Sequence, residues 1–122
     1  MTVPSRDYTP YLRSARLRAL TKTPRWTERR EKAMLAAQRA AAFVREHFPD
    51  ARVTLFGSLL YPDSFGADSD IDLAIEGVKW PEYLRLWSAL ERREADFEID
   101  LVDIGIVSPG LKAHIEREGT PL

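Results

Sequence analysis

The fold is decided by residues 52–77, which read RVTLFGSLLYPDSFGADSDIDLAIEG. Their first five residues are β-prone and run into a glycine, which is typical of a strand that ends in a turn. Residues 57–69 are rich in Gly, Pro, Asp and Ser, and this composition indicates a loop. Residues 70–76 then alternate strictly, so a strand here sends its aliphatic side chains to one face and Asp70 and Asp72 to the other.

The sequence outside this stretch predicts four helices. Three of them begin at Ser/Thr-Pro steps, where the hydroxyl caps free backbone N–H groups and proline is tolerated in the first turn. The predicted helices span residues 10–20, 24–48, 81–94 and 109–118. We expect Tyr83, Leu84, Trp87 and Leu90 to form the buried face of the third helix. The last helix is expected to end at Gly119 in a left-handed turn.

A third strand is predicted over residues 97–102, which alternate again and place Glu98 and Asp100 on one side. The elements together predict an α/β (α+β) fold. It consists of a small mixed β-sheet of three strands, with a fourth short strand left unplaced, and of helices packed on the apolar face of that sheet. The other face is the one toward which the carboxylates point.

Composition restricts the class of protein. The chain has 122 residues, 44% of them hydrophobic and 30% charged, which fits one globular domain. It has no cysteine, so disulfides and thiolate zinc sites are excluded. Charged residues near the start argue against a signal peptide, and no apolar run is long enough to span a membrane. We therefore expect a cytoplasmic protein without a membrane contact. His47 and His114 lie far apart, and neither is given a role.

Charge is unevenly distributed along the chain. Residues 1–30 hold eight Lys/Arg and two Asp/Glu, a balance of +6, whereas the net charge of the chain is −1. We therefore divide the chain into a basic N-terminal arm with a short helix, residues 1–26, and a domain, residues 27–122. The arm suits an acidic partner or a contact with RNA, and a solvated helix face accounts for it equally well.

Three carboxylates and a glycine corner are the candidates for chemistry. Asp70 and Asp72 have Cα atoms about 6.5 Å apart and project from the same side of a strand. Two such charges about 5 Å apart repel by roughly 3 kcal/mol at an effective dielectric of 20, and a divalent ion between them reverses that cost. Asp100 interrupts an apolar strand, where an unpaired charge is costly. A role as a third metal ligand explains its presence. Gly57 and Ser58 end the first strand, where a glycine lets a phosphate approach the backbone.

With these motifs in this order, the sequence resembles the nucleotidyltransferase superfamily related to DNA polymerase β, and within it the minimal nucleotidyltransferases. The resemblance covers about residues 30 to 120. It implies that Gly57 and Ser58 hold the triphosphate of ATP, and that Asp70, Asp72 and Asp100 ligate two Mg²⁺ ions and are the catalytic residues. One departure is that Leu59 and Leu60 follow Gly-Ser, where many relatives have an arginine.

The same resemblance implies a function. Minimal members resemble antitoxins that are paired with HEPN-domain ribonuclease toxins, and members of such pairs transfer AMP to a tyrosine of the toxin. We therefore expect a Mg²⁺-dependent protein adenylyltransferase that acts as an antitoxin and forms a complex with a HEPN-domain toxin. Two alternatives stay open: nucleotidyl transfer to a small hydroxylated molecule such as an aminoglycoside, and a non-catalytic nucleotide-binding module that inhibits its partner sterically.

Overall fold

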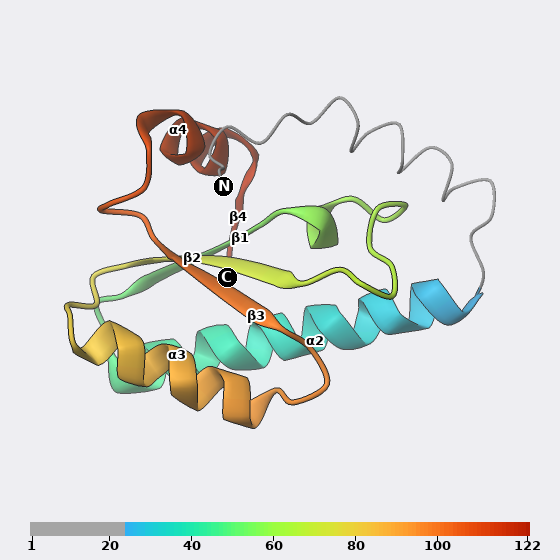
Figure 1. Cartoon of the computed structure of the whole chain (residues 1–122), viewed down its shortest axis with the longest axis horizontal. Helices are drawn as coiled ribbons and strands as arrows, with labels where there is room; N and C mark the ends of the chain where they lie inside the picture. Colours follow the sequence, from blue (N-terminus) through green and yellow to red (C-terminus); the bar gives the residue numbers. More distant parts are fainter. Residues whose placement is uncertain (1–23) are drawn as a thin grey trace.

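The computed structural model describes residues 24–122, which form one mixed four-stranded sheet with three helices (Figure 1). The strands are β1 (Arg52–Phe56), β2 (Ile71–Glu76), β3 (Ile99–Asp103) and β4 (Thr120–Pro121), in the order β3-β2-β1-β4. Strand β1 pairs antiparallel with both β2 and β4, whereas β2 and β3 are parallel. The parallel pair is joined by a helix, as a crossover connection requires.

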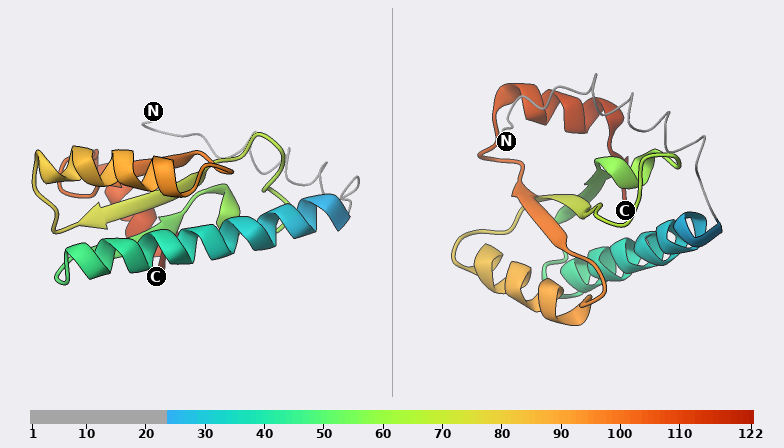
Figure 2. Two further views of the ribbon diagram at one scale, coloured as in Figure 1. Left: turned by 90° about the horizontal axis from the view of Figure 1, so that it is seen from below. Right: turned by 45° about the vertical axis from the view of Figure 1, so that its right-hand side comes forward.

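The helices occupy both faces of the sheet. They are α2 (Pro24–His47), α3 (Glu82–Arg93) and α4 (Pro109–Glu118), and a short 3₁₀ turn, η1 (Ser58–Leu60), follows β1. Figure 2 shows α2 and α3 on one side of the sheet and α4 on the other. The expected fold class is confirmed, with the addition that α4 does not share the face of the other two helices.

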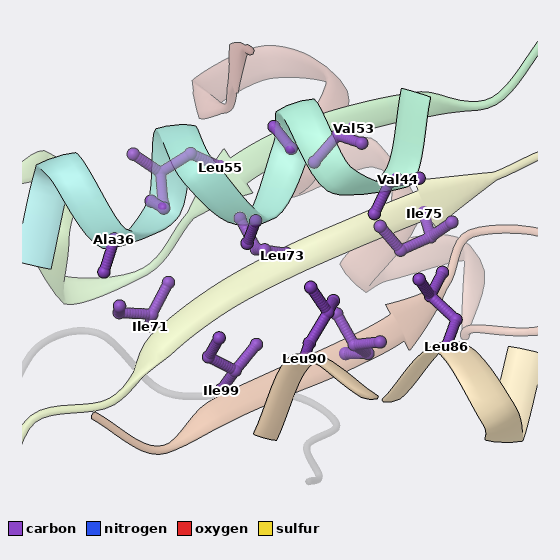
Figure 3. Close-up of a cluster of buried hydrophobic side chains, with 14 of the residues drawn as sticks. Ala36, Val44, Val53, Leu55, Ile71, Leu73, Ile75, Leu86, Leu90 and Ile99 are labelled. Carbon is purple, nitrogen blue, oxygen red and sulfur yellow. The ribbon is translucent and has the colours of Figure 1, made fainter. Parts of the chain in front are cut away.

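The main hydrophobic core lies between the sheet and the two helices α2 and α3 (Figure 3). Every second residue of β2 belongs to it, namely Ile71, Leu73 and Ile75, and each is at most 1% exposed. Helix α2 contributes a stripe of alanines and Val44, and the small side chains let the long helix lie close to the strands. The alternation of β2 therefore directs its aliphatic side chains into this core, as predicted.

A second, smaller core lies on the opposite face of the sheet. Phe56 of β1 and Ala74 of β2 pack there against Ile115 of α4. Ser108 caps the first turn of α4, because its hydroxyl accepts a hydrogen bond from the backbone N–H of Leu111. Helix α4 therefore covers part of the face that carries the acidic residues of β2 and β3.

Three expectations differ from the structure or fall outside it. Leu84 is not part of the buried face of α3: it is 48% exposed, and Leu86 takes its place in the core. Gly119 is extended rather than left-handed, with φ −71° and ψ 159°. A Cβ atom there would lie 2.5 Å from the Ile115 carbonyl oxygen, so close packing accounts for this glycine. The helix expected at residues 10–20 lies outside the described residues, as does most of the basic arm.

Within residues 24–122 no helix combines the length and the apolar character needed to cross a bilayer.

Candidate active site

Gly57 is held in a conformation that only glycine adopts readily. It follows β1 with φ 83° and ψ −156°, and it precedes the 3₁₀ turn η1. A Cβ atom at this position would overlap a carboxylate oxygen of Asp72 and would lie 3.0 Å from the carboxylate carbon. The backbone of Gly57 is therefore packed directly against the carboxylate of Asp72.

Register brings two of the predicted carboxylates side by side. Asp72 of β2 is the parallel partner of Asp100 of β3, and it also lies opposite Phe56 of β1. Neighbouring strands are about 4.8 Å apart, and paired residues of parallel strands project from the same face. That face is the one opposite the main core, so the structure brings Asp72 and Asp100 together with the Gly57 corner.

Asp70 lies just before β2, and the preceding loop fixes its position. The N–H of Ile71 donates to the carbonyl oxygen of Glu98 at 2.9 Å, which joins the starts of β2 and β3. The loop is anchored in the main core by Phe65, and the Ser69 hydroxyl accepts a hydrogen bond from the N–H of Gly66. The start of β2 is therefore fixed from both sides.

Exposure increases across the three aspartates. Asp72 is buried, Asp70 is half-buried and Asp100 is exposed. Ser58 is 8% exposed and begins the 3₁₀ turn directly after Gly57. The site is therefore closed at β1 and β2 and open to solvent at β3, as far as residues 24–122 form it.

The donor set fits a hard divalent cation. Its ligands are carboxylate oxygens, which suit Mg²⁺, and the missing Cβ of Gly57 lets the backbone pack against the carboxylate of Asp72. Within residues 24–122 no three acidic, histidine or cysteine side chains are gathered closely enough to form a finished metal centre. The strand register places Asp72 and Asp100 on one sheet face, and Asp70 lies just before β2. The role of these three aspartates as metal ligands is a proposal.

Aromatic side chains of α3 support β3 at the residue before Asp100. The indole N–H of Trp87 donates to the carbonyl oxygen of Ile99 at 2.9 Å. Trp87 also packs edge-on against Tyr83, with ring centroids 6.2 Å apart. Burial raises the pKa of Tyr83, and the negative charges of Asp103 and Asp100 raise it further.

Other acidic residues have ordinary roles. Asp103 accepts a hydrogen bond from the N–H of Gly105 at 2.9 Å, which stabilises the turn after β3. Asp63, Asp68 and Glu98 are exposed.

Two arginines of α2, which the sequence interpretation only counted among the charges of residues 1–30, have a structural role that it did not assign. Arg29 and Arg30 both bind backbone carbonyl groups of the loop between β1 and β2. The helix periodicity could have indicated this role. Arg29 and Arg30 lie four and three residues before Ala33, on the same side of the helix as its buried alanines.

Comparison with known proteins identifies the family. The family Polymerase beta, Nucleotidyltransferase matches residues 40–122, so the chain belongs to this family of nucleotidyltransferases. A solved structure described as a candidate minimal nucleotidyltransferase is similar in fold, with a TM-score of 0.61 and 24% sequence identity. The similarity covers 76% of this chain and 95% of that one. No curated protein matches the sequence significantly.

Proposed function

We propose that this chain is a Mg²⁺-dependent protein adenylyltransferase and antitoxin. It transfers AMP from ATP to a hydroxyl group of a partner protein, and the proposed acceptor is a tyrosine of a HEPN-domain ribonuclease. Membership of the family supports nucleotidyl transfer, since its members generally use a nucleoside triphosphate and a divalent metal. The protein acceptor, the antitoxin role and the complex with the toxin are the parts that we add.

The observation that carries the proposal is the pairing of a buried and an exposed aspartate on neighbouring strands. Asp72 is 7% exposed beside Gly57, whereas its register partner Asp100 is exposed on β3, at the edge of the described sheet. An acceptor hydroxyl can therefore reach Asp100 from solvent on the surface of another protein.

Each residue has a defined task in this reaction. Asp70 and Asp72 would hold Mg²⁺ together with the triphosphate, and Asp100 would share a metal ion and orient the acceptor hydroxyl. Bound Mg²⁺ would neutralise charge on the α-phosphate and on the pyrophosphate. The acceptor oxygen forms a bond to the α-phosphorus, and the bond from the α-phosphorus to the oxygen that bridges to the β-phosphate breaks, so that pyrophosphate leaves. The hydroxyl proton passes to solvent beside Asp100. Gly57 and Ser58 hold the phosphate tail that leaves.

Labelling of the partner tests the proposal. The full chain is incubated with Mg²⁺, the HEPN protein and ATP that carries the label on the α-phosphate, and the intact mass of the partner is measured. We expect label on the partner, the mass of one AMP adduct, and no label from γ-labelled ATP. Asp70→Asn and Asp72→Asn should abolish the transfer, whereas Glu98→Gln, a change at an exposed carboxylate nearby, should not.

The same variants separate the alternatives. Turnover of ATP with a hydroxylated small molecule, without any protein acceptor, would contradict the protein-acceptor proposal. Inhibition of the ribonuclease that persists in Asp70→Asn and Asp72→Asn would indicate steric inhibition instead. If the partner stays unlabelled with several nucleotides and metals, the adenylyltransferase proposal is wrong.

A further inference from the structure

Two consecutive arginines of α2 bind the loop that carries Gly57 and Ser58. Arg30 donates from Nε and Nη2 to the carbonyl oxygen of Leu59, at 3.2 and 2.9 Å. Arg29 donates from Nε to the carbonyl oxygen of Gly66 at 3.2 Å. Helix α2 is therefore hydrogen-bonded to the loop at two points, and the first of them is the residue directly after Ser58.

The contact of Arg30 lies at the end of the 3₁₀ turn. The carbonyl groups of Gly57 and Ser58 accept hydrogen bonds from Leu60 and Tyr61, which leaves the carbonyl of Leu59 to Arg30. Leu59 itself is fully buried in the main core. Because the turn is fixed from inside by Leu59 and from α2 by Arg30, the guanidinium has a fixed place next to the Gly57–Ser58 corner.

The charge of Arg30 is not compensated within the described residues. Three ion pairs join described residues to each other, namely Glu28–Lys32, Arg39–Glu94 and Glu82–Arg85, and neither Arg29 nor Arg30 takes part in these. Arg30 is half-buried, and its two hydrogen bonds use two of the five N–H donors of a guanidinium. A partly desolvated cation with free donors is well suited to bind an anion.

Arg29 differs from Arg30 in its surroundings. Its guanidinium lies over the ring of Phe97, 4.7 Å from the centroid, and 5.8 Å from the centroid of Phe65. The two rings and the carbonyl of Gly66 hold it at the far end of the loop. Arg29 is thus suited to position the loop.

We propose that Arg30 supplies the positive charge for the phosphate tail at the Gly57–Ser58 corner and so makes the site selective for nucleotides with more phosphates. Leu59 and Leu60 offer no cation there, and Arg30 reaches the same turn from a helix that lies far away in sequence. This inference rests on nucleotide binding at the proposed site, but not on the identity of the acceptor.

Affinities for a series of nucleotides test it. Dissociation constants of ATP, ADP and AMP are measured by calorimetry in Mg²⁺ buffer for the full chain and for Arg30→Gln. Loss of one charge-assisted interaction should weaken ATP binding about tenfold or more, and AMP binding by less than about twofold. Arg30→Lys keeps the charge and should retain most of the ATP/AMP affinity ratio, and it serves as the test if Arg30→Gln does not fold.

Arg92→Gln is the matched control. Arg92 is an exposed arginine of α3, and its substitution changes the net charge by the same amount. We expect the affinities of this variant to equal those of the unchanged protein. Thermal unfolding of all variants reports whether the fold is retained.

The outcomes separate this inference from the proposed function. An unchanged ATP/AMP ratio in Arg30→Gln, or equal weakening of both ligands, overturns the inference and assigns Arg30 to the structure of the loop alone. A phosphate-dependent loss supports it even if no partner is labelled, in which case only the protein-acceptor proposal fails. If the unchanged protein binds no nucleotide, both are wrong.

Discussion

Substitution of Gly57 by alanine should damage both the stability and the site. The residue has φ 83° and ψ −156°, a region that costs a residue with a side chain about 1–3 kcal/mol. The added methyl would also overlap the carboxylate of Asp72, and forcing that buried side chain off its rotamer costs about 0.5–1.5 kcal/mol more. We expect Gly57→Ala to lose about 2–4 kcal/mol in urea unfolding and to bind Mn²⁺–ATP at least about tenfold more weakly.

Gly77→Ala is the matched control because it has the backbone strain without the carboxylate. Gly77 has φ 95°, and its added Cβ would lie 3.2 Å from the carbonyl oxygen of Asp50 and 3.3 Å from the Cα of Ala51. This variant should lose about 1–3 kcal/mol of stability and bind nucleotide normally. If Gly57→Ala binds Mn²⁺–ATP as well as Gly77→Ala does, Gly57 does not shape the carboxylate site.

Three further predictions concern the residues around the site. Asp72→Asn and Asp100→Asn should each lower the rate of AMP transfer by about 100-fold or more, and a variant that transfers AMP as fast as the unchanged protein would contradict this. Because Asp100 is exposed, Asp100→Asn should change the free energy of unfolding by no more than about 0.5 kcal/mol. Trp87→Phe should lose about 1–3 kcal/mol in urea unfolding because the carbonyl of Ile99 loses its donor, and no loss would show that water replaces it. Because the pKa of Tyr83 is raised in the folded protein, the contribution of this phenol to stability is complete below pH about 10 and is lost as the pH rises further. Above pH about 10 the melting temperature of Tyr83→Phe should therefore fall less steeply with pH than that of the unchanged protein.

Local patterns were sufficient to predict most elements of the fold. The alternation in residues 70–76 predicted β2 and the split between its aliphatic and acidic faces, and the structure shows both. The strand of residues 52–56 and the helix that begins at Pro24 are also confirmed. The third strand begins at Ile99 rather than at Phe97, because Phe97 forms a turn with Glu94.

The remaining features depend on distant parts of the chain. Strand β4 has two residues and exists because it pairs with β1, about 65 positions earlier, so no local pattern could indicate it. The place of α4 on the second face follows from its contact with Phe56 and Ala74, which no helix period reveals. The contact of Gly57 with Asp72 likewise requires the register of β1 and β2.

A single register links the core to the proposed chemistry. In β2 the side chains with odd numbers enter the main core, and Asp72 lies between them on the other face. A shift of β2 by one residue against its neighbours would turn the carboxylates into the main core and the aliphatic residues away from it. The hydrophobic effect that stabilises the core therefore also selects the register that pairs Asp72 with Asp100. Helix α4 covers Ala74 two residues further along β2. The acidic site is therefore confined to the end of the sheet where β2 and β3 begin, next to the loop that Arg30 holds.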